Sequence, residues 1–289
     1  MGAPEVVNDL ALHRMRPEDA EAAMALSEEA GWNQTVEDWR FMLGRGEAYG
    51  LQEAGGAWAA SSLVLPQGPQ VSWISMVLVA RRHRRRGLGT MLLRRCVEAV
   101  QASGAVPGLD ATELGRPVYL PQGFRDLYPI SRWRLERAPA PLAPPRGCTI
   151  RAMQESDLSA VCAFDAPRTR TDRAATLRYL RTRVPHHACV AEQDGRLVGY
   201  ALGRPGRKTA QAGPVVAENV SIALALLSRI AGLGPPVILD VPDAHRTITD
   251  WLEAHDAVRE RGFARMTLGT VPGLDDPGAI FALAGPELS

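Results

Sequence analysis

The residues best suited to chemistry in this sequence form a cationic turn with two glycines, Arg84-Arg85-Arg86-Gly87-Leu88-Gly89-Thr90. The apolar run Val71–Val79 before it predicts a strand, and the pattern of Met91–Val100 after it predicts a helix. Glycine lets the backbone bend tightly and approach a ligand without a Cβ atom in the way. Unpaired N–H groups at a helix start attract anions, and arginine adds charge-assisted hydrogen bonds to phosphate oxygens. The turn therefore predicts a site for a pyrophosphate group.

Two common phosphate-binding patterns do not fit this turn. The dinucleotide pattern G-x-G-x-x-G would need glycine in place of Arg85, and the P-loop would need Gly-Lys-Ser/Thr. The spacing Arg84-x-x-Gly87-x-Gly89, between a strand and a helix, instead resembles the acetyl-CoA loop of the GNAT acetyltransferase superfamily, R/Q-x-x-G-x-G/A. The resemblance implies acetyl-CoA as a cosubstrate, held by residues 84–90 and by the strand backbone at Val77, Leu78 and Val79.

The basic run RRHRRR at 81–86 is also typical of nucleic-acid or targeting patches. The whole chain carries a formal net charge of +1, so no broad basic field surrounds this run. We therefore expect no nucleic-acid partner.

Composition is that of an ordinary globular protein, with 46% hydrophobic and 22% charged residues. No apolar stretch approaches the length that spans a bilayer, and the sequence starts without a signal pattern. We expect a cytoplasmic protein with no membrane partner. The cysteines are scattered and have no partners at metal-ligand spacing, which predicts reduced thiols and no metal site: Cys96, Cys148, Cys162 and Cys189.

The same order of elements occurs twice, on either side of a Pro/Ala-rich stretch. Hairpin signals at Gly55-Gly56 and Asp194-Gly195 occupy matching positions in the two copies. Each copy predicts the order β-α-β-β-β-α-β-α-β, an α/β fold with a mixed, mostly antiparallel central sheet flanked by helices. This organisation resembles two tandem GNAT domains. We predict an N-terminal acetyl-CoA-binding domain at 1–138, a linker at 139–147 and a C-terminal GNAT-like domain at 148–289.

The second copy departs from the first at the turn, where the sequence is Val215-Val216-Ala217-Glu218-Asn219-Val220. It has no glycine or arginine. Glu218 would repel a pyrophosphate, and Asn219 is a good helix N-cap that satisfies the amides a phosphate would use. We therefore expect the second domain not to bind CoA. Three roles stay open for this second domain. It could wall the acceptor pocket, mediate contact in a homodimer, or stabilise the first domain.

The resemblance implies a general acid at Tyr119, in the pattern Tyr-x-x-x-Gly-Phe, where the superfamily has a tyrosine that protonates the departing thiolate. A phenol of pKa ~10 can protonate the thiolate of a thiol of pKa ~8.5. A role for Tyr119 in packing alone stays open. The general base is not assigned, because the strand before the turn has no carboxylate; Asp110, Glu113 and a chain of waters are the alternatives. A structural role for Asp110 at the end of its strand is equally open. Cys96 falls on the apolar side of its helix, which predicts core packing.

The first copy also resembles a bacterial GNAT branch with the pattern G-W-N-Q-T…D-W, here from Gly31 to Trp39. We predict that Trp32, Asn33 and Asp110 line the acceptor site, although a core role for Trp32 is equally open. The motif is expected on a helix and loop, and we expect loops around 31–46 and the second domain to set acceptor selectivity. The resemblance implies direct acetyl transfer to a small or peptidyl amine in a ternary complex. The alternative is a non-catalytic acyl-CoA sensor or partner-binding module.

Overall fold

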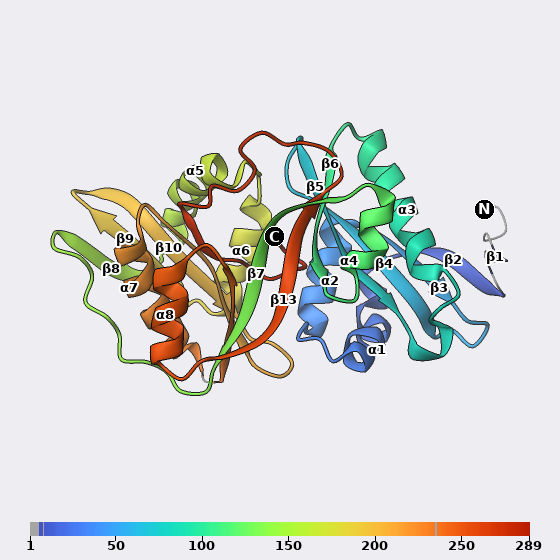
Figure 1. The fold of residues 1–289 in the computed structure, drawn as a ribbon, viewed down its shortest axis with the longest axis horizontal. Coiled ribbons are helices and arrows are strands. Elements are labelled where there is room, and N and C mark those ends of the chain that lie inside the picture. The colour runs from blue at the N-terminus through green and yellow to red at the C-terminus, as the bar shows by residue number, and fades with distance from the viewer. Residues whose placement is uncertain (1–5, 8, 235) are drawn as a thin grey trace. The chain divides into compact units, whose positions relative to one another are not determined.

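The computed structural model describes residues 6, 7, 9–234 and 236–289, which form two compact units divided after Leu109 (Figure 1). The first unit ends at Leu109 and the second runs from Asp110 to Ser289. Each unit is a sheet with helices against it, which confirms the predicted fold class.

The first unit is built on strands in the order β1-β2-β3-β4-β5-β6, all antiparallel except for the parallel pair β5–β6. The strands are β1 (Val6–Val7), β2 (Leu10–Met15), β3 (Glu47–Gln52), β4 (Trp58–Pro66), β5 (Val71–Val79) and β6 (Val106–Thr112), of which β6 begins in this unit. The helices are α1 (Ala20–Ala30), α2 (Val36–Arg45) and α3 (Leu88–Ala102), and a 3-10 turn covers Pro17–Asp19.

Helices cover both faces of this sheet. Every residue of β4 from Trp58 to Leu65 is buried, which a strand achieves only when both of its faces are covered. Figure 1 shows α3 on one side of these strands and α1 with α2 on the other. The indole of Trp39 on α2 donates to Ser27 Oγ on α1 at 3.0 Å, and both side chains are fully buried. The two helices are therefore fixed to each other.

Helix α2 occupies most of residues 31–46, where the sequence predicted selectivity loops beside a helix. Thr35 caps α2: its Oγ1 accepts from the Asp38 amide at 3.3 Å, and the Asp38 carboxylate accepts from the Thr35 amide at 2.7 Å. This reciprocal arrangement is a capping box, which satisfies two amides that the helix cannot satisfy itself. The signal Thr-x-x-Asp was present in the sequence.

The second unit has a sheet in the order β13-β7-β12-β11-β10-β9-β8, with β14 paired to β11. Only β11–β12 is parallel among these pairs. The strands are β7 (Arg125–Leu135), β8 (Cys148–Ala152), β9 (Cys189–Gln193), β10 (Arg196–Arg204), β11 (Ala210–Ala217), β12 (Val237–Pro242), β13 (Val258–Thr267) and β14 (Ile280–Ala282). The helices are α4 (Arg116–Tyr119), α5 (Leu158–Thr169), α6 (Ala174–Arg183), α7 (Val220–Ile230) and α8 (Arg246–Ala254).

Strand β7 explains why the compact units divide after Leu109 instead of within the predicted linker at 139–147. It pairs with β12 along one edge and with β13 along the other, as Trp133 does with Leu239 and Arg259. The linker is itself held in this unit, because the Leu142 amide donates to Ser228 Oγ on α7 at 2.8 Å. The predicted division of the sequence at 138 and 148 stays a prediction.

Candidate active site

The turn between β5 and α3 ends in an open helix N-terminus. Gly87 has a φ of +75° and α3 begins at Leu88. The amide of Met91 bonds to the Gly87 carbonyl at 3.0 Å, so the amides of Leu88, Gly89 and Thr90 precede the first bond inside the helix. A Cβ atom on Gly87 would meet nothing within 4 Å, so the space beside this glycine, at the start of the helix, is open.

Gly89, in contrast to Gly87, lies close to the side chains of β5. A Cβ atom there would lie 3.4 Å from Val79 Cγ2 and 4.0 Å from Val77 Cγ1. These are ordinary van der Waals distances, so the first turn of α3 lies directly beside the end of β5.

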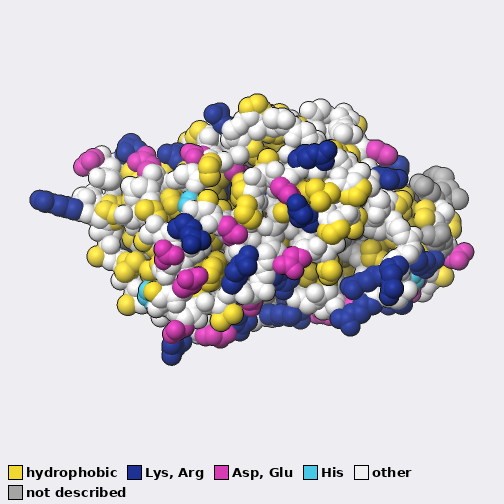
Figure 2. Space-filling model, viewed as in Figure 1, with side chains coloured by type: hydrophobic (Ala, Val, Ile, Leu, Met, Phe, Trp, Pro, Cys, Tyr) yellow, Lys and Arg dark blue, Asp and Glu magenta, His cyan; other side chains and the backbone are white. Residues whose placement is uncertain are grey.

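The turn is strongly cationic, because Arg84, Arg85 and Arg86 are all exposed. Arg85 has a φ of +61°, a left-handed conformation that reverses the chain just before the helix. Figure 2 shows Lys and Arg side chains gathered at the lower right of the first unit, where Figure 1 draws the loop that leads into α3. Positive side chains and the positive end of the helix dipole act together here.

Glu53, in the turn between β3 and β4, anchors the cationic turn. Its Oε1 accepts from Arg82 Nε at 2.7 Å and contacts His83 Nε2 at 2.5 Å. Arg86 Nη1 lies 2.8 Å from His83 Nδ1, and since a guanidinium only donates, Nδ1 accepts and Nε2 donates to Glu53. Hydrogen bonds from His83 and Arg82 lower the pKa of Glu53. These contacts tie the cationic turn to the turn between β3 and β4.

Strand β5 bulges where the chain approaches this turn. Met76 has a φ of +52°, the register with β4 shifts between Ser61 and Leu63, and Ser61 Oγ donates to the Met76 carbonyl at 2.8 Å. A bulge bends a strand and re-aims the groups that follow it. Here those groups are Val77–Val79.

Strands β5 and β6 part after their first three pairs. Among the described residues, the pairing of β5 with β6 covers Val71–Trp73 against Val106–Gly108. Gly108 is needed for this approach, because a Cβ atom there would lie 2.5 Å from the Trp73 ring. The backbone of Val77–Val79 pairs with β4 through Leu78 and Val79, and its other edge lies beyond the last pair with β6.

Tyr119 belongs to the second unit and is the last residue of the short helix α4. Its ring lies 6.0 Å from that of Phe124, and a Cβ atom on Gly115 would lie 2.9 Å from its Cε2. Burial raises the pKa of Tyr119 to about 12. The phenol is therefore protonated throughout the neutral range, which is the form a general acid needs.

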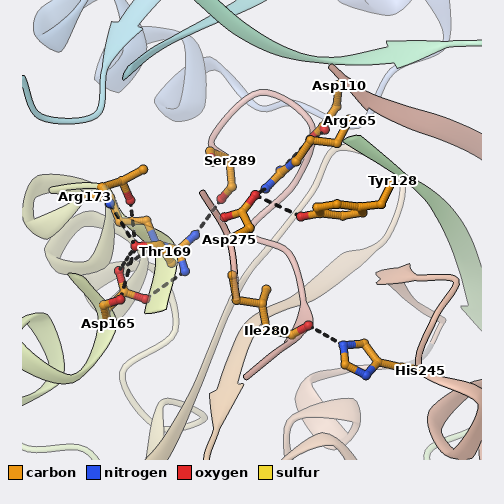
Figure 3. Close-up of polar contacts among 11 residues, drawn as sticks. Asp110, Tyr128, Asp165, Thr169, Arg173, His245, Arg265, Asp275, Ile280 and Ser289 are labelled. Carbon is orange, nitrogen blue, oxygen red and sulfur yellow. Dashed lines mark hydrogen bonds and ion pairs between the residues drawn. The ribbon is translucent and has the colours of Figure 1, made fainter. Parts of the chain in front are cut away.

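Asp110 also belongs to the second unit, where it is part of a buried ion pair. Arg265 binds both oxygens of Asp110, with Nε and Nη2 at 2.9 and 2.8 Å, and its Nη1 binds Asp275 (Figure 3). Tyr128 donates to Asp275 at 2.9 Å. Burial raises the pKa of Asp110 to about 6, against the opposing charge of Arg265. These contacts give Asp110 a structural role, and acceptor binding by Asp110 stays a prediction.

Trp32 and Asn33 lie between α1 and α2 in the first unit. Gly31 ends α1 with a φ of +72°, and the Trp32 amide bonds to the Ser27 carbonyl at 2.8 Å. Trp32 is half-buried and Asn33 is buried, whereas the nearby core tryptophan is Trp39. Half-burial leaves part of the Trp32 ring at the surface, and its role at the acceptor site stays a prediction.

Cys96 is a core residue, as its helical position predicted. It is fully buried beside Ser62 Oγ at 3.0 Å, and burial raises the pKa of its thiol to about 12. A protonated, buried thiol is a poor nucleophile.

The second unit is different at the position that matches the cationic turn. The Asn219 side chain caps α7 by accepting from the Ile222 amide at 3.0 Å, as predicted. Glu218 binds Arg196, whose hydrogen bond lowers the pKa of the carboxyl. At the start of α7, the Asn219 side chain therefore already accepts a hydrogen bond from a helix amide, and Glu218 supplies an ionised carboxylate.

Comparisons with known proteins place both halves in one family. The acetyltransferase (GNAT) family model matches residues 14–124, and the acetyltransferase (GNAT) domain model matches residues 161–282. The chain is a tandem member of the GNAT superfamily.

Relatives and solved structures agree with this assignment. The uncharacterized N-acetyltransferase YitH of Bacillus subtilis (strain 168) is 24% identical over 261 residues, which are 90% of this chain and 89% of YitH. A putative acetyltransferase from Pyrococcus horikoshii has the same fold, with a TM-score of 0.80, 18% identity and 99% of each chain covered. A GCN5-related N-acetyltransferase from Sphaerobacter thermophilus has a TM-score of 0.66 at 20% identity, covering 94% of this chain and 99% of its own.

Two searches over the described residues bear on other functions of this GNAT protein. No group of three or more His, Cys, Asp or Glu side chains in that part of the chain could hold a metal ion. None of its described helices is long and apolar enough to cross a membrane.

Sequence reasoning missed two features of the GNAT site and one strand of the second unit. Glu53 lies about thirty residues before the turn that it anchors, and no local pattern connects the two. The bulge at Met76 interrupts an apolar run that has no glycine to mark it. Strand β14 lies in a segment rich in proline and glycine, which gave no strand signal.

Proposed function

We propose that this chain is an acetyl-CoA-dependent N-acetyltransferase that moves an acetyl group directly to a primary amine. The observation that carries this proposal is the start of α3, where open space lies beside Gly87. Three exposed arginines surround this position. Membership of the GNAT superfamily supports acyl transfer as the reaction class.

The diphosphate of CoA would bind to the amides at the start of α3 and to the arginines of residues 84–86. Both the helix dipole and the guanidinium groups favour negative charge there. The residues present fit this ligand. Gly87 has no side chain, and any other residue there would place one in the open space that the diphosphate needs. The amide groups of pantetheine would pair with the backbone of Val77–Val79, as an added strand pairs with a sheet edge.

The reaction joins the amine nitrogen to the acetyl carbon and breaks the carbon–sulfur bond. Overall, one proton leaves the nitrogen and one reaches the sulfur. We propose that Tyr119 gives its proton to the departing thiolate. Because the pKa of Tyr119 is about 12, proton transfer from its phenol to the thiolate of a thiol of pKa ~8.5 is by itself uphill by about 5 kcal/mol. The phenolate must therefore recover a proton from the attacking nitrogen in the same step.

The attacking amine must first be neutral. Strand β5 has no carboxylate, and the carboxylate of Asp110 is fully buried against Arg265. We propose that solvent water takes this proton and that no side chain acts as a strong base. The rate should then follow the fraction of neutral amine as the pH rises.

A thiol-release assay tests the proposal. The purified chain, acetyl-CoA and single amines (amino acids, polyamines, aminoglycosides and peptides) are combined, and free CoA is measured with a thiol reagent. A protein-only control corrects for Cys162, the one native cysteine among the described residues that is not fully buried. Product mass identifies the acetylated nitrogen. The proposal fails if no amine raises release above hydrolysis.

A non-catalytic acyl-CoA sensor is the second candidate function, and the absence of a carboxylate on β5 favours it. A sensor would bind acetyl-CoA with the same dependence on Gly87 but release no thiol with any amine. We further propose a cytoplasmic protein that acts on a small or peptidyl amine, without a nucleic-acid or membrane partner. A homodimer stays open and is decided by sedimentation.

A further inference from the structure

The second unit contains a gap between two parallel strands, like the gap that parts β5 from β6. Strands β11 and β12 pair in parallel at Ala210 and Gln211, against Val237 and Ile238. Helix α7 then follows β11, as α3 follows β5. In the first unit the matching edge, Val77–Val79, is the proposed pantetheine site.

A segment of the chain itself lies along this edge of β11. Strand β14 pairs antiparallel with β11, with Val215 opposite Ala282 and Val216 opposite Ile280. The Ala217 amide also donates to the Ala279 carbonyl at 2.9 Å. The segment 279–284 therefore uses the backbone groups of β11 that follow its last pair with β12.

The other side of the segment is bonded to β12 and to the start of α8. The Leu283 amide donates to the Asp240 carbonyl of β12 at 2.9 Å. His245 Nε2 lies 2.6 Å from the Ile280 carbonyl (Figure 3), and the His245 ring lies 4.4 Å from that of Phe281. The segment thus bridges the gap and bonds to both of its walls.

This segment is closely packed and buried. All residues from Ala279 to Ala284 are at most 4% exposed. A Cβ atom on Gly213 of β11 would lie 2.0 Å from the Leu283 carbonyl oxygen, so glycine is required where the two backbones pass. A second ligand could not enter without removing the segment.

Two buried arginines hold the residues that follow. Arg204 forms an ion pair with Glu287, and both side chains are at most 2% exposed. Arg173 binds both oxygens of Asp165 at 2.9 Å, and its Nη1 donates to the Ser289 carbonyl at 2.7 Å (Figure 3). These two arginines therefore hold the chain after β14, at Glu287 and at Ser289.

We propose that residues 279–284 permanently occupy, in the second unit, the slot that receives pantetheine in the first. The chain then binds one acyl-CoA, in its first unit, while its own backbone closes the second slot. This inference rests on the proposed function, which assigns the slot in the first unit to pantetheine. The ionised Glu218 and the cap by Asn219 agree with it, because they leave no phosphate site at the start of α7.

A disulfide lock tests the proposal. In the double variant Val215→Cys/Ala282→Cys, the new cysteines are register partners on adjacent strands, a spacing that a disulfide can bridge. Mild oxidation should form this bond, detected by peptide mass mapping, and each single variant is the control. The locked protein should bind one acetyl-CoA with the affinity of wild type. No bond between 215 and 282, two acetyl-CoA per wild-type chain, or loss of binding on locking would each overturn the proposal.

Hydrogen exchange on the wild type gives a second readout that needs no variant. The amides of Ala217 and Leu283 should be as protected as those between β10 and β11, and acetyl-CoA should leave them unchanged. Fast exchange, or a change on adding acetyl-CoA, would contradict a permanent occupant. If neither wild type nor the locked protein binds acetyl-CoA while the disulfide forms, the proposed function fails and the occupied slot remains.

Discussion

Replacing Gly87 with glutamate should strongly weaken acetyl-CoA binding without unfolding the protein. The new side chain would project into open space, since a Cβ atom at Gly87 meets nothing within 4 Å. Its carboxylate would stand in front of the α3 amides, where the CoA diphosphate is proposed to bind. The backbone would also be strained, because Gly87 has a φ of +75°.

The strain and the repulsion can be separated by magnitude. A side chain in the left-handed region costs about 1–2 kcal/mol of stability. Two unit charges 4 to 8 Å apart repel by about 2–4 kcal/mol at an effective dielectric constant of 20, and by about 0.5–1 kcal/mol in bulk water. The effective dielectric constant at this exposed turn lies between these two values, and we therefore take a repulsion of about 2 kcal/mol per phosphate charge. The dissociation constant should rise at least about 30-fold.

Gly56→Glu is the matched control. Gly56 has a φ of +84° and open space around its Cβ position, and it lies in the turn between β3 and β4. Both variants should lose a similar amount of stability in urea unfolding, and only Gly87→Glu should lose binding in calorimetry. Gly87→Gln separates charge from bulk: it should bind more tightly than Gly87→Glu, and added salt should narrow the difference.

Equal affinity of wild type and Gly87→Glu would refute the reasoning, provided that both proteins are folded by circular dichroism. Equal loss of binding in Gly56→Glu would also refute it. In that case strain in the first unit, and not occupation of the turn, would explain the effect.

Four further predictions concern turnover, stability, pH and the anchor of the turn. Tyr119→Phe should lower kcat about 10²- to 10⁴-fold and leave the dissociation constant of acetyl-CoA unchanged; unchanged kcat would exclude the acid role. Arg265→Met leaves two buried carboxylates without their partner and should cost about 3–5 kcal/mol in urea unfolding, more than Asp110→Asn, which leaves Arg265 paired with Asp275. The raised pKa of Asp110, about 6 against 3.8, means that the folded state holds this proton more tightly than the unfolded chain, so its contribution to stability should fall as the pH rises from about 4 to about 6. This part of the pH slope should vanish in Asp110→Asn, and an unchanged slope would contradict the assignment. Glu53→Gln should weaken acetyl-CoA binding about three- to tenfold by releasing His83 and Arg82, whereas the exposed control Glu18→Gln should not.

The elements around the turn were predictable because local sequence determines them. An apolar run, a glycine with arginines before it and an amphipathic helix follow one another, and the structure places β5, Gly87 and α3 in that order. Asn219 was equally predictable, since its side chain bonds to an amide only three residues away. The capping box at Thr35 was just as local, and its signal was overlooked.

The remaining features depend on partners far apart in the sequence. Arg265 binds Asp110, 155 residues earlier, and β14 pairs with a strand more than sixty residues before it. Neither pairing has a periodicity that marks it. For that reason the sequence left both an acceptor-site role and a structural role open for Asp110, and the structure shows its carboxylate bound to a buried guanidinium.

The structure of this chain with acetyl-CoA is the measurement that tests the central claim most directly. We expect the diphosphate on the amides of Leu88, Gly89 and Thr90, and pantetheine against Val77–Val79, with one ligand per chain. Density for the diphosphate at any other helix start, with the turn at Gly87 vacant, would contradict the account.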